Sequence, residues 1–291
     1  MRRFRAFGKF NLCLGVLGKR EDGYHEIDTI LQSISLADDL FCEPLASAEL
    51  IVECEAAGVP SGRANLAWKA LELLRDRYGV RAGLKIRIEK HIPAQAGLGG
   101  GSADAACALA AADRIWGLGR EPSELEAVAA DVGSDVPFFI RGGTRRCRGR
   151  GERTEAVEGL PPSRWAIIKP PWGLGTAEVY GGVGSGLTAD ESRINMVQSC
   201  LAKRDLSGVL AWMFNDLESA AMSVRSEAGE IKAWMLDLGM VGVVLAGSGS
   251  AWVGRCPKGL PAHRVRREAE GKGWRAFEVE TSNQGWIEVQ E

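Results

Sequence analysis

The first 60 residues of the chain read as strands and tight turns. An apolar run covers Phe10–Val16, apolar and polar residues alternate over Thr29–Leu36, and Leu50–Cys54 is a short strand candidate. Asp22-Gly23 is a turn signal between the first two of these runs. The pattern therefore predicts that the chain opens with strands joined by short turns.

Helical spacing follows. Residues 65–78 carry apolar side chains on one helical face and are followed by a glycine, which predicts a helix. A strand is expected over Leu84–Ile88, then a glycine-rich loop, then a long alanine-rich helix that ends near Gly117. Glu121–Val132 is expected to form a shorter helix, and Pro137–Gly143 a buried strand.

The remaining residues mix both patterns. Pro161-Pro162 marks a boundary. Strands are expected over Trp165–Lys169, Val241–Ala246 and Ala251–Gly254, and helical periodicity dominates Ile194–Leu238. Because strands and helices do not alternate as regular βαβ units, we expect an α+β fold. A length of 291 residues allows two domains, which we place at 1–160 and 161–291.

Composition narrows the functional classes. The net charge is −2 and the isoelectric point about 6.1, so no overall basic field attracts nucleic acid or anionic membranes. No apolar run is long enough to span a bilayer, and the basic N-terminus lacks the apolar stretch of a signal peptide. We therefore expect a cytoplasmic protein that binds neither nucleic acid nor membranes, as a monomer or a homodimer.

Cysteine and histidine usage argues against a metal site made by the protein alone. The seven cysteines are scattered, odd in number and never spaced as C-x-x-C, and the three histidines form no ligand pair. A Mg²⁺ ion held by oxygen ligands and phosphates leaves no such trace and stays open.

The glycine-rich loop is the strongest chemical signal. It reads Pro93-Ala94-Gln95-Ala96-Gly97-Leu98-Gly99-Gly100-Gly101-Ser102-Ala103. Glycines let a backbone approach a phosphate, and the free N–H groups and dipole of a helix N-terminus attract it. The loop lacks the lysine-Ser/Thr ending of a Walker A motif. A flexible connector, or close packing of helix and strand, is the alternative explanation.

Two polar residues follow the glycines. Ser102 could cap the helix, hold Mg²⁺, or bind a phosphate. Asp104 sits in the first turn, where it is either a favourable partner of the helix dipole or an acceptor for a substrate hydroxyl or amine.

The loop resembles the phosphate-binding motif of the GHMP small-molecule kinases. Two further motifs of that family flank it in order: Gly8–Leu14 (GKFNLCL) is similar to its lysine-x-asparagine-leucine strand, and Leu245–Ser250 (LAGSGS) to its glycine-serine-glycine loop. The resemblance covers about residues 9–254. It implies a two-domain GHMP kinase fold, with ATP as phosphoryl donor and Mg²⁺ as its partner.

Three more segments are similar to the branch of this family that acts on a cytidine diphosphate-linked methylerythritol. They are Lys19–Ile27 (KREDGYHEI), Gly133–Phe139 (GSDVPFF) and Lys169–Tyr180 (KPPWGLGTAEVY). Asn215–Glu218 (NDLE) is similar to another landmark of the family. The resemblance implies phosphorylation of the 2-hydroxyl of 4-diphosphocytidyl-2-C-methyl-D-erythritol in non-mevalonate isoprenoid synthesis.

The resemblance also implies catalytic roles. Asp135 would be the base for the substrate hydroxyl, and Lys9 its cationic neighbour, since a lysine keeps a nearby carboxylate ionised. Residues 93–103 would cradle the ATP phosphates, with Ser102 as a Mg²⁺ ligand. Taken alone, Lys9 would be a solvated lysine, and Asp135 a turn or cap residue.

The substrate pocket is implied in the same way. Tyr24 and Tyr180 would sandwich the cytosine while His25 bonds its edge. Asn11 would orient Lys9 or touch the substrate, and Thr176 would also bind the substrate. Alternatives are a homoserine- or mevalonate-type kinase and a catalytically silent nucleotide-binding regulator on the same scaffold.

Three features depart from the family pattern or stay unassigned. Gln95 stands where the family usually keeps small residues, and Trp172 has no assigned role. The stretch Thr144–Arg153 is unusually basic; a solvated hairpin is favoured over extra attraction for a diphosphate.

Overall fold

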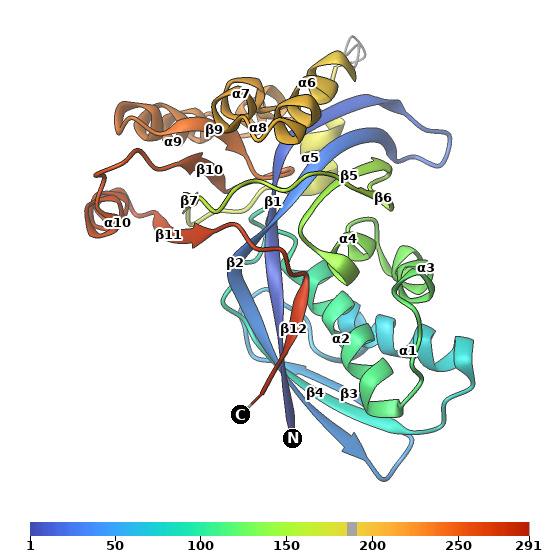
Figure 1. The fold of residues 1–291 in the computed structure, drawn as a ribbon. Helices are drawn as coiled ribbons and strands as arrows, with labels where there is room; N and C mark the ends of the chain where they lie inside the picture. The colour runs from blue at the N-terminus through green and yellow to red at the C-terminus, as the bar shows by residue number, and fades with distance from the viewer. Residues whose placement is uncertain (185–190, 291) are drawn as a thin grey trace.

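The computed structural model describes residues 1–184 and 191–290, and Figure 1 shows the course of the chain. The first part forms β1 (Arg2–Lys19), β2 (His25–Leu45), β3 (Leu50–Cys54), the 3₁₀ turn η1 (Gly62–Ala64), α1 (Leu66–Tyr78), β4 (Gly83–Glu89), α2 (Gly100–Trp116), α3 (Pro122–Val132), α4 (Val136–Arg141), β5 (Thr144–Gly149) and β6 (Arg153–Ala156). The second part forms β7 (Arg164–Lys169), α5 (Thr176–Gly181), α6 (Glu191–Ala202), α7 (Leu206–Trp212), β8 (Phe214–Asn215), α8 (Glu218–Val224), α9 (Glu227–Asp237), β9 (Val241–Leu245), β10 (Trp252–Arg255), α10 (Ala262–Gly271), β11 (Arg275–Glu280) and β12 (Trp286–Val289).

A large sheet is built on the two longest strands, β1 and β2. Within the described residues it has eight strands in the order β12-β1-β2-β4-β3, with β5 and β6 continuing from β2 and with β8 beside β1. The strands predicted over Phe10–Val16 and Thr29–Leu36 are confirmed but lie inside longer strands. Polar residues beyond both apolar runs still pair across the β1–β2 ladder, which hydropathy alone does not reveal.

Strand β1 is irregular around two residues of the predicted site. Its register with β2 shifts between Phe7 and Lys9, and again between Asn11 and Cys13. Bulges of this kind bend a strand and re-aim its side chains. Lys9 and Asn11 lie between the two shifts, and residues two apart in a strand share one face.

Helices α1–α4 cover the lower part of this sheet (Figure 1). Every residue of α2 from Ala103 to Asp113 is buried, and the small alanine side chains let its neighbours pack closely. The helix predicted over 65–78 is confirmed as α1, with Asn65 as N-cap and Gly79 as C-cap, and the one over Glu121–Val132 as α3.

The prediction of a buried strand over Pro137–Gly143 is wrong, because Val136–Arg141 forms helix α4. A short apolar run has no periodicity that separates a buried strand from a buried helix. Proline in the first turn suits a helix start, and Asp135 occupies the N-cap position. Asp135 is thus carried on the start of a short buried helix.

A second sheet belongs to the other end of the molecule. Its order is β11-β7-β10-β9, and each neighbouring pair is antiparallel. The strands predicted over Trp165–Lys169, Val241–Ala246 and Ala251–Gly254 are confirmed as β7, β9 and β10 within one or two residues. The helical region 194–238 becomes α6–α9, interrupted by β8, and the α+β class is confirmed.

Hydrophobic contacts join the parts of the molecule that carry the first and the second sheet. The ring of Phe10 on β1 lies 4.8 Å from that of Trp165 on β7, measured between centroids. Their cluster also contains Leu98 from the glycine loop and Phe214 from β8. The division into 1–160 and 161–291 stays a prediction.

The C-terminal strand returns to the first sheet. β12 pairs with the start of β1, so both termini lie near each other in Figure 1. The indole N–H of Trp286 donates to the Ile140 carbonyl at 3.0 Å, at the end of α4. A Cβ on Gly285 would meet the Phe139 carbonyl oxygen at 1.9 Å, so this segment packs directly on the helix that follows Asp135.

Candidate active site

The glycine loop connects β4 to α2. Gly97 and Gly99 have φ of 75° and 74°, which disfavours other residues. A Cβ on Gly97 would lie 1.7 Å from the Ala246 carbonyl oxygen, so this glycine is required by close approach to the loop after β9. The helix begins at Gly100 with Gly99 as N-cap, so a capping role for Ser102 is wrong.

The glycine loop and the segment after β9 are bonded to each other. The N–H groups of Ser250 and Ala251 donate to the carbonyls of Gln95 and Ala96, both at 3.2 Å. Gln95 itself has a positive φ of 51°, and its side chain lies against Gly173, where a Cβ would meet it at 2.2 Å. The long side chain at position 95 is therefore accommodated by a glycine opposite.

Lys9 and Asn11 form a buried network under the loop. The Lys9 ammonium donates to Asn11 Oδ1 at 2.9 Å, and the same oxygen accepts the Gly247 N–H at 3.0 Å. The Asn11 amide donates in turn to Thr29 Oγ1 at 2.8 Å. Lys9 is only 3% exposed, so its charge is held in place at the point where three segments meet.

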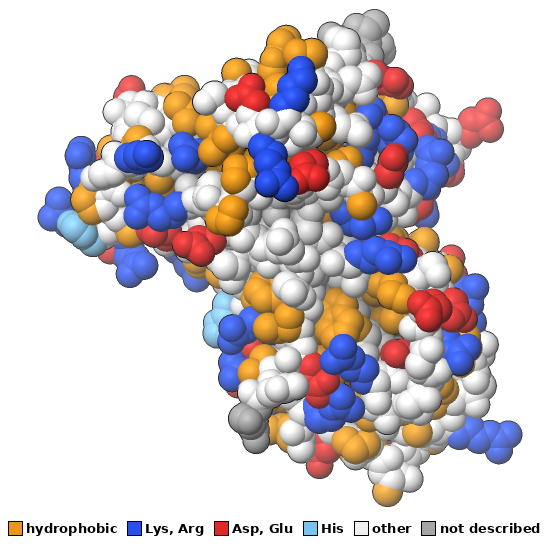
Figure 2. All heavy atoms as spheres, viewed as in Figure 1, with side chains coloured by type: hydrophobic (Ala, Val, Ile, Leu, Met, Phe, Trp, Pro, Cys, Tyr) orange, Lys and Arg blue, Asp and Glu red, His pale blue; other side chains and the backbone are white. Residues whose placement is uncertain are grey.

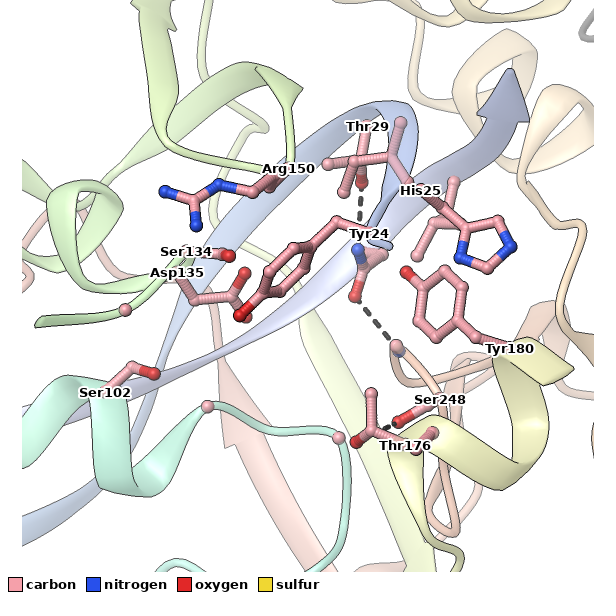
Figure 3. A pocket seen from close by; sticks show the side chains of 18 of the residues that line it. Tyr24, His25, Thr29, Ser102, Ser134, Asp135, Arg150, Thr176, Tyr180 and Ser248 are labelled. Atoms are coloured by element: carbon pink, nitrogen blue, oxygen red, sulfur yellow. Dashed lines mark hydrogen bonds between the residues drawn. The ribbon is translucent and has the colours of Figure 1, made fainter. Parts of the chain in front are cut away.

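The Asp135 carboxylate completes this group. Its Oδ2 lies 3.7 Å from Lys9 Nζ, and its side chain is about one-third exposed, at 34%. Figure 3 shows Asp135 and Ser134 on one side of an open pocket, with Ser102 below them. A partly exposed carboxylate beside a buried ammonium can accept a proton from a bound hydroxyl.

These groups line a cavity of about 760 Å³. Its walls include the following residues of the predicted site: Lys9, Asn11, Tyr24, His25, Gly97, Gly99, Ser102, Asp135, Thr176 and Tyr180. The sequence motifs, which are far apart in the chain, thus meet around one space.

Aromatic side chains surround one part of this cavity. The His25 ring lies 5.0 Å from the Tyr180 ring at an interplanar angle of 34°. Tyr24 is half exposed, and the Arg150 guanidinium stands 5.0 Å from its ring centroid. Partial burial, and secondarily the charge of Lys19, lowers the pKa of His25, while burial raises the pKa of Tyr180.

A second cavity of about 350 Å³ lies along the glycine loop. It is lined by Pro93, Ala94, Gln95, Ala96, Leu98, Gly100 and Gly101, and it shares Gly97, Gly99 and Ser102 with the first cavity. Ala103 lines neither cavity, and its N–H already donates to the Gly99 carbonyl at 2.8 Å. The two cavities therefore meet at the start of α2.

The basic stretch Thr144–Arg153 forms a hairpin, β5–β6, but it is not uniformly solvated as expected. Arg146 is buried, with its guanidinium 2.5 Å from Asp28 Oδ2. Arg150 faces the first cavity, whereas Arg148 and Arg153 are exposed. Arg146 and Arg148 share one face of β5 and both approach Asp28 Oδ2, but only Arg146 is buried, where this aspartate on β2 neutralises it.

Sequence reasoning missed several residues of the site. Lys19, Thr29, Ser134 and Ser248 also line the first cavity, and Ser248 Oγ lies 3.0 Å from Thr176 Oγ1. Thr29 pairs with Leu14 in the β1–β2 register and bonds to Asn11 across the register shift between Asn11 and Cys13, so strand alternation alone does not bring the two together. In residues 1–184 and 191–290, no group of three or more His, Cys, Asp or Glu side chains could hold a metal ion.

The surface agrees with the balanced composition. Positive and negative side chains are interspersed over the face shown in Figure 2. No helix among the described residues combines the length and apolar character needed to cross a membrane.

Comparison with known proteins places this site in a family. A family described as GHMP kinases N terminal domain matches residues 65–143. The chain is 44% identical to the 4-diphosphocytidyl-2-C-methyl-D-erythritol kinase of Pelotomaculum thermopropionicum, covering 84% of this chain and 85% of the relative. It is 38% identical to the enzyme of that name from Syntrophotalea carbinolica, covering 97% and 100%.

Solved structures agree with these relatives. A crystal structure of 4-(cytidine 5'-diphospho)-2C-methyl-D-erythritol kinase superposes with a TM-score of 0.78 at 34% identity, covering 96% of this chain and 99% of that one. A homoserine kinase from Cytophaga hutchinsonii shares the fold at the same TM-score but only 15% identity, covering 99% and 97%. The chain therefore belongs to the family of the 4-diphosphocytidyl-2-C-methyl-D-erythritol kinases, within the GHMP kinases.

Proposed function

We propose that this protein transfers the γ-phosphoryl group of ATP to the 2-hydroxyl of 4-diphosphocytidyl-2-C-methyl-D-erythritol, in non-mevalonate isoprenoid synthesis. The observation that carries the proposal is the single cavity that holds Lys9 and Asp135 between the glycine loop and the aromatic group of Tyr24, His25 and Tyr180. A phosphate site on one side and a base-stacking site on the other suit a nucleotide-linked alcohol and ATP together.

The two adjoining cavities suggest where ATP binds. We propose that its nucleoside lies in the second cavity and that its phosphates follow Gly97, Gly99 and Ser102 into the first, where both cavities share these residues. Backbone N–H groups at the start of α2 and the helix dipole would stabilise the phosphate charge. The γ-phosphoryl group would then face Lys9 and Asp135.

The reaction itself needs positioning and charge neutralisation more than covalent chemistry. Asp135 accepts the proton of the 2-hydroxyl as its oxygen bonds to the γ-phosphorus, and the bond from that phosphorus to the β-phosphate oxygen breaks to release ADP. Lys9 keeps the carboxylate ionised and stabilises charge on the moving group. Asn11 fixes the ammonium by accepting one of its protons in a hydrogen bond.

Ser102 suits a Mg²⁺ site of the kind that kinases use. In the described structure its hydroxyl makes no hydrogen bond, and it borders both cavities. A hard cation favours such an oxygen together with phosphate oxygens and water. When bound, Mg²⁺ would neutralise phosphate charge; Ser102 would supply one ligand.

The cytidyl group gives the substrate its specificity. We propose that the base lies against Tyr24 and Tyr180 and that His25 bonds its edge, with Thr176 near the rest of the molecule. Stacking on an aromatic side chain contributes about 1–3 kcal/mol per base. Homoserine and mevalonate have no base to stack, so this group separates the proposed substrate from those alternatives.

ADP release measured by a coupled assay tests the function. We expect turnover with 4-diphosphocytidyl-2-C-methyl-D-erythritol and ATP, and ³¹P NMR of the product should show a new phosphomonoester. Activity with homoserine or mevalonate, and none with the cytidyl compound, would contradict the proposal. ATP binding without turnover of any of the three would instead support a silent regulator.

We also propose that the enzyme works in the cytoplasm, as a monomer or a homodimer. Cell fractionation and sedimentation equilibrium test these two statements independently of the activity.

A further inference from the structure

Three charged side chains are buried together beneath the glycine loop. Lys90 Nζ lies 2.5 Å from Asp38 Oδ2 and 2.6 Å from Asp104 Oδ2. The side chains of all three are at most 7% exposed. Asp104, for which the sequence left open a role as an acceptor for a substrate hydroxyl or amine, is instead buried and paired with Lys90. The mechanism above uses none of the three residues.

The triad closes both ends of the loop. Asp38, on β2, accepts the backbone N–H groups of His91 and Ile92 at 2.6 and 2.8 Å with its other oxygen, where the loop begins. Asp104 lies near the start of α2, where the loop has ended. Lys90 bridges the two carboxylates, so its ammonium holds the loop entrance and the helix start at a fixed separation.

Stability alone does not explain this arrangement. Two carboxylates share one ammonium in the interior, and Asp104 Oδ1 is buried without a partner among the described residues. Buried ionic groups are often no more stabilising than well-packed apolar residues of the same volume. Burial, which opposes the effect of Lys90, raises the pKa of Asp104 to about 7.

The location of the triad points to the nucleotide. Lys90 and Asp104 line the second cavity and are absent from the walls of the first. A Cβ on Gly100 would meet Lys90 Nζ at 3.1 Å, so the ammonium lies against the first residue of α2. A shift of Lys90 would therefore move the backbone N–H groups that face the shared region of the two cavities.

We propose that Asp38, Lys90 and Asp104 are positioning residues that hold the glycine loop in the shape that binds ATP phosphates. This inference rests on the proposed function. It predicts that breaking the triad weakens nucleotide binding selectively and leaves the cytidyl site intact.

The test compares two lysine variants, one on β4 and one directly after this strand. Lys90→Met removes the bridging charge. Lys85→Met removes a partly exposed lysine on β4, whose Nζ lies 2.9 Å from Oε1 of Glu53 on β3. Titration calorimetry measures the Kd of ADP and, separately, of cytidine diphosphate. We expect Lys90→Met to raise the ADP Kd and the KM for ATP about tenfold to a hundredfold. Both variants should leave the cytidine diphosphate Kd within about twofold, and Lys85→Met should leave all constants unchanged.

A milder variant keeps the test decisive if Lys90→Met does not fold. Asp104→Asn preserves side-chain volume and an oxygen for Lys90 but removes one charge, and we expect it to raise the ADP Kd several-fold. Lys90→Arg keeps the positive charge, so its ADP Kd should lie between those of wild type and Lys90→Met. An unchanged ADP Kd in a folded triad variant, or an equal rise for both ligands, overturns the inference. Wild-type protein that binds ADP but does not phosphorylate the cytidyl alcohol overturns the proposed function alone.

Discussion

Lys9 shows how one buried charge can organise a site at the scale of single residues. Its ammonium donates to Asn11 Oδ1 at 2.9 Å and lies 3.7 Å from Asp135 Oδ2, and the lysine side chain is almost completely buried. The sequence marked Lys9, Asn11 and Asp135 only through motif resemblance, because each residue alone fits a surface or turn position. Their meeting depends on bulges in β1, which have no local sequence signal, and on helix α4, whose short apolar run does not distinguish a buried helix from a buried strand.

Asp135→Asn tests the base directly. The amide keeps the shape of the carboxylate but cannot take the proton, so kcat should fall by about 10²- to 10⁴-fold. The ADP Kd should stay within about twofold of wild type. Asp131→Asn, an exposed carboxylate in α3 that pairs only loosely with Arg77 at 3.9 Å, is the matched control and should leave kcat unchanged. An unimpaired Asp135→Asn enzyme would place the base elsewhere.

His25 gives the site a pH dependence. Its pKa lies below the ordinary 6.5, so the neutral imidazole, which both donates and accepts, prevails at pH 7. The KM for the cytidyl substrate should be flat above pH 6.5 and rise as the pH falls and the ring becomes protonated. His25→Gln, which does not titrate, should abolish the rise while the KM for ATP follows wild type. A rise that persists in His25→Gln assigns it to another group.

At the scale of elements, the glycine loop and the hairpin β5–β6 differ in what could be predicted. The loop could be predicted because its four glycines lie within five residues and its chemistry is local. The inward turn of Arg146 was missed because its partner, Asp28, is 118 residues away. The Asp38–Lys90–Asp104 triad was missed for the same reason, since a charge pattern does not show which carboxylates share an interior.

Gly97→Ala should disable the loop without unfolding the protein. The new Cβ would collide with the Ala246 carbonyl, so the loop must move away from β9, and kcat/KM for ATP should fall by about a hundredfold or more. Gly119→Ala is the control, because Gly119 also has a positive φ, 62°, but a Cβ there meets nothing within 4 Å. It should cost about 1 kcal/mol of stability and no activity. Equal kinetics for both variants would contradict the close-approach argument.

Arg146→Met should be strongly destabilising. It leaves Asp28 buried without its partner and also removes bonds to Asn195 and Gln198 on α6, so the free energy of unfolding should drop by about 3–5 kcal/mol. Arg148→Met, at an exposed position 3.6 Å from the same aspartate, should cost less than about 1 kcal/mol. Urea titration followed by circular dichroism measures both. Comparable losses would show that the buried pair is not special.

At the scale of the whole molecule, composition and periodicity predicted the α+β fold class. They did not predict the contacts between the two halves of the chain. The cluster around Phe10 and Trp165 takes residues from either side of residue 160, and β12 returns to β1. Such long-range contacts depend on shape complementarity across the chain, which hydropathy does not encode.

Those shared contacts predict cooperative unfolding. Because one hydrophobic cluster spans both proposed domains, urea should unfold the chain in a single transition, seen identically by circular dichroism and by tryptophan fluorescence. Trp165→Ala should shift that transition as a whole, by about 3–5 kcal/mol. Two separated transitions would show that 1–160 and 161–291 fold independently.

The pairing of residues 282–289 with the first sheet also determines when, during synthesis on the ribosome, the enzyme can complete its fold. The chain is made from its N-terminus, so β1, the glycine loop and Asp135 emerge long before the strand that packs on α4. Until Gly285 and Trp286 have been made, helix α4 lacks the packing of this segment, and part of its apolar surface stays exposed. We therefore expect activity only after the C-terminal segment has been made, although the glycine loop emerges much earlier.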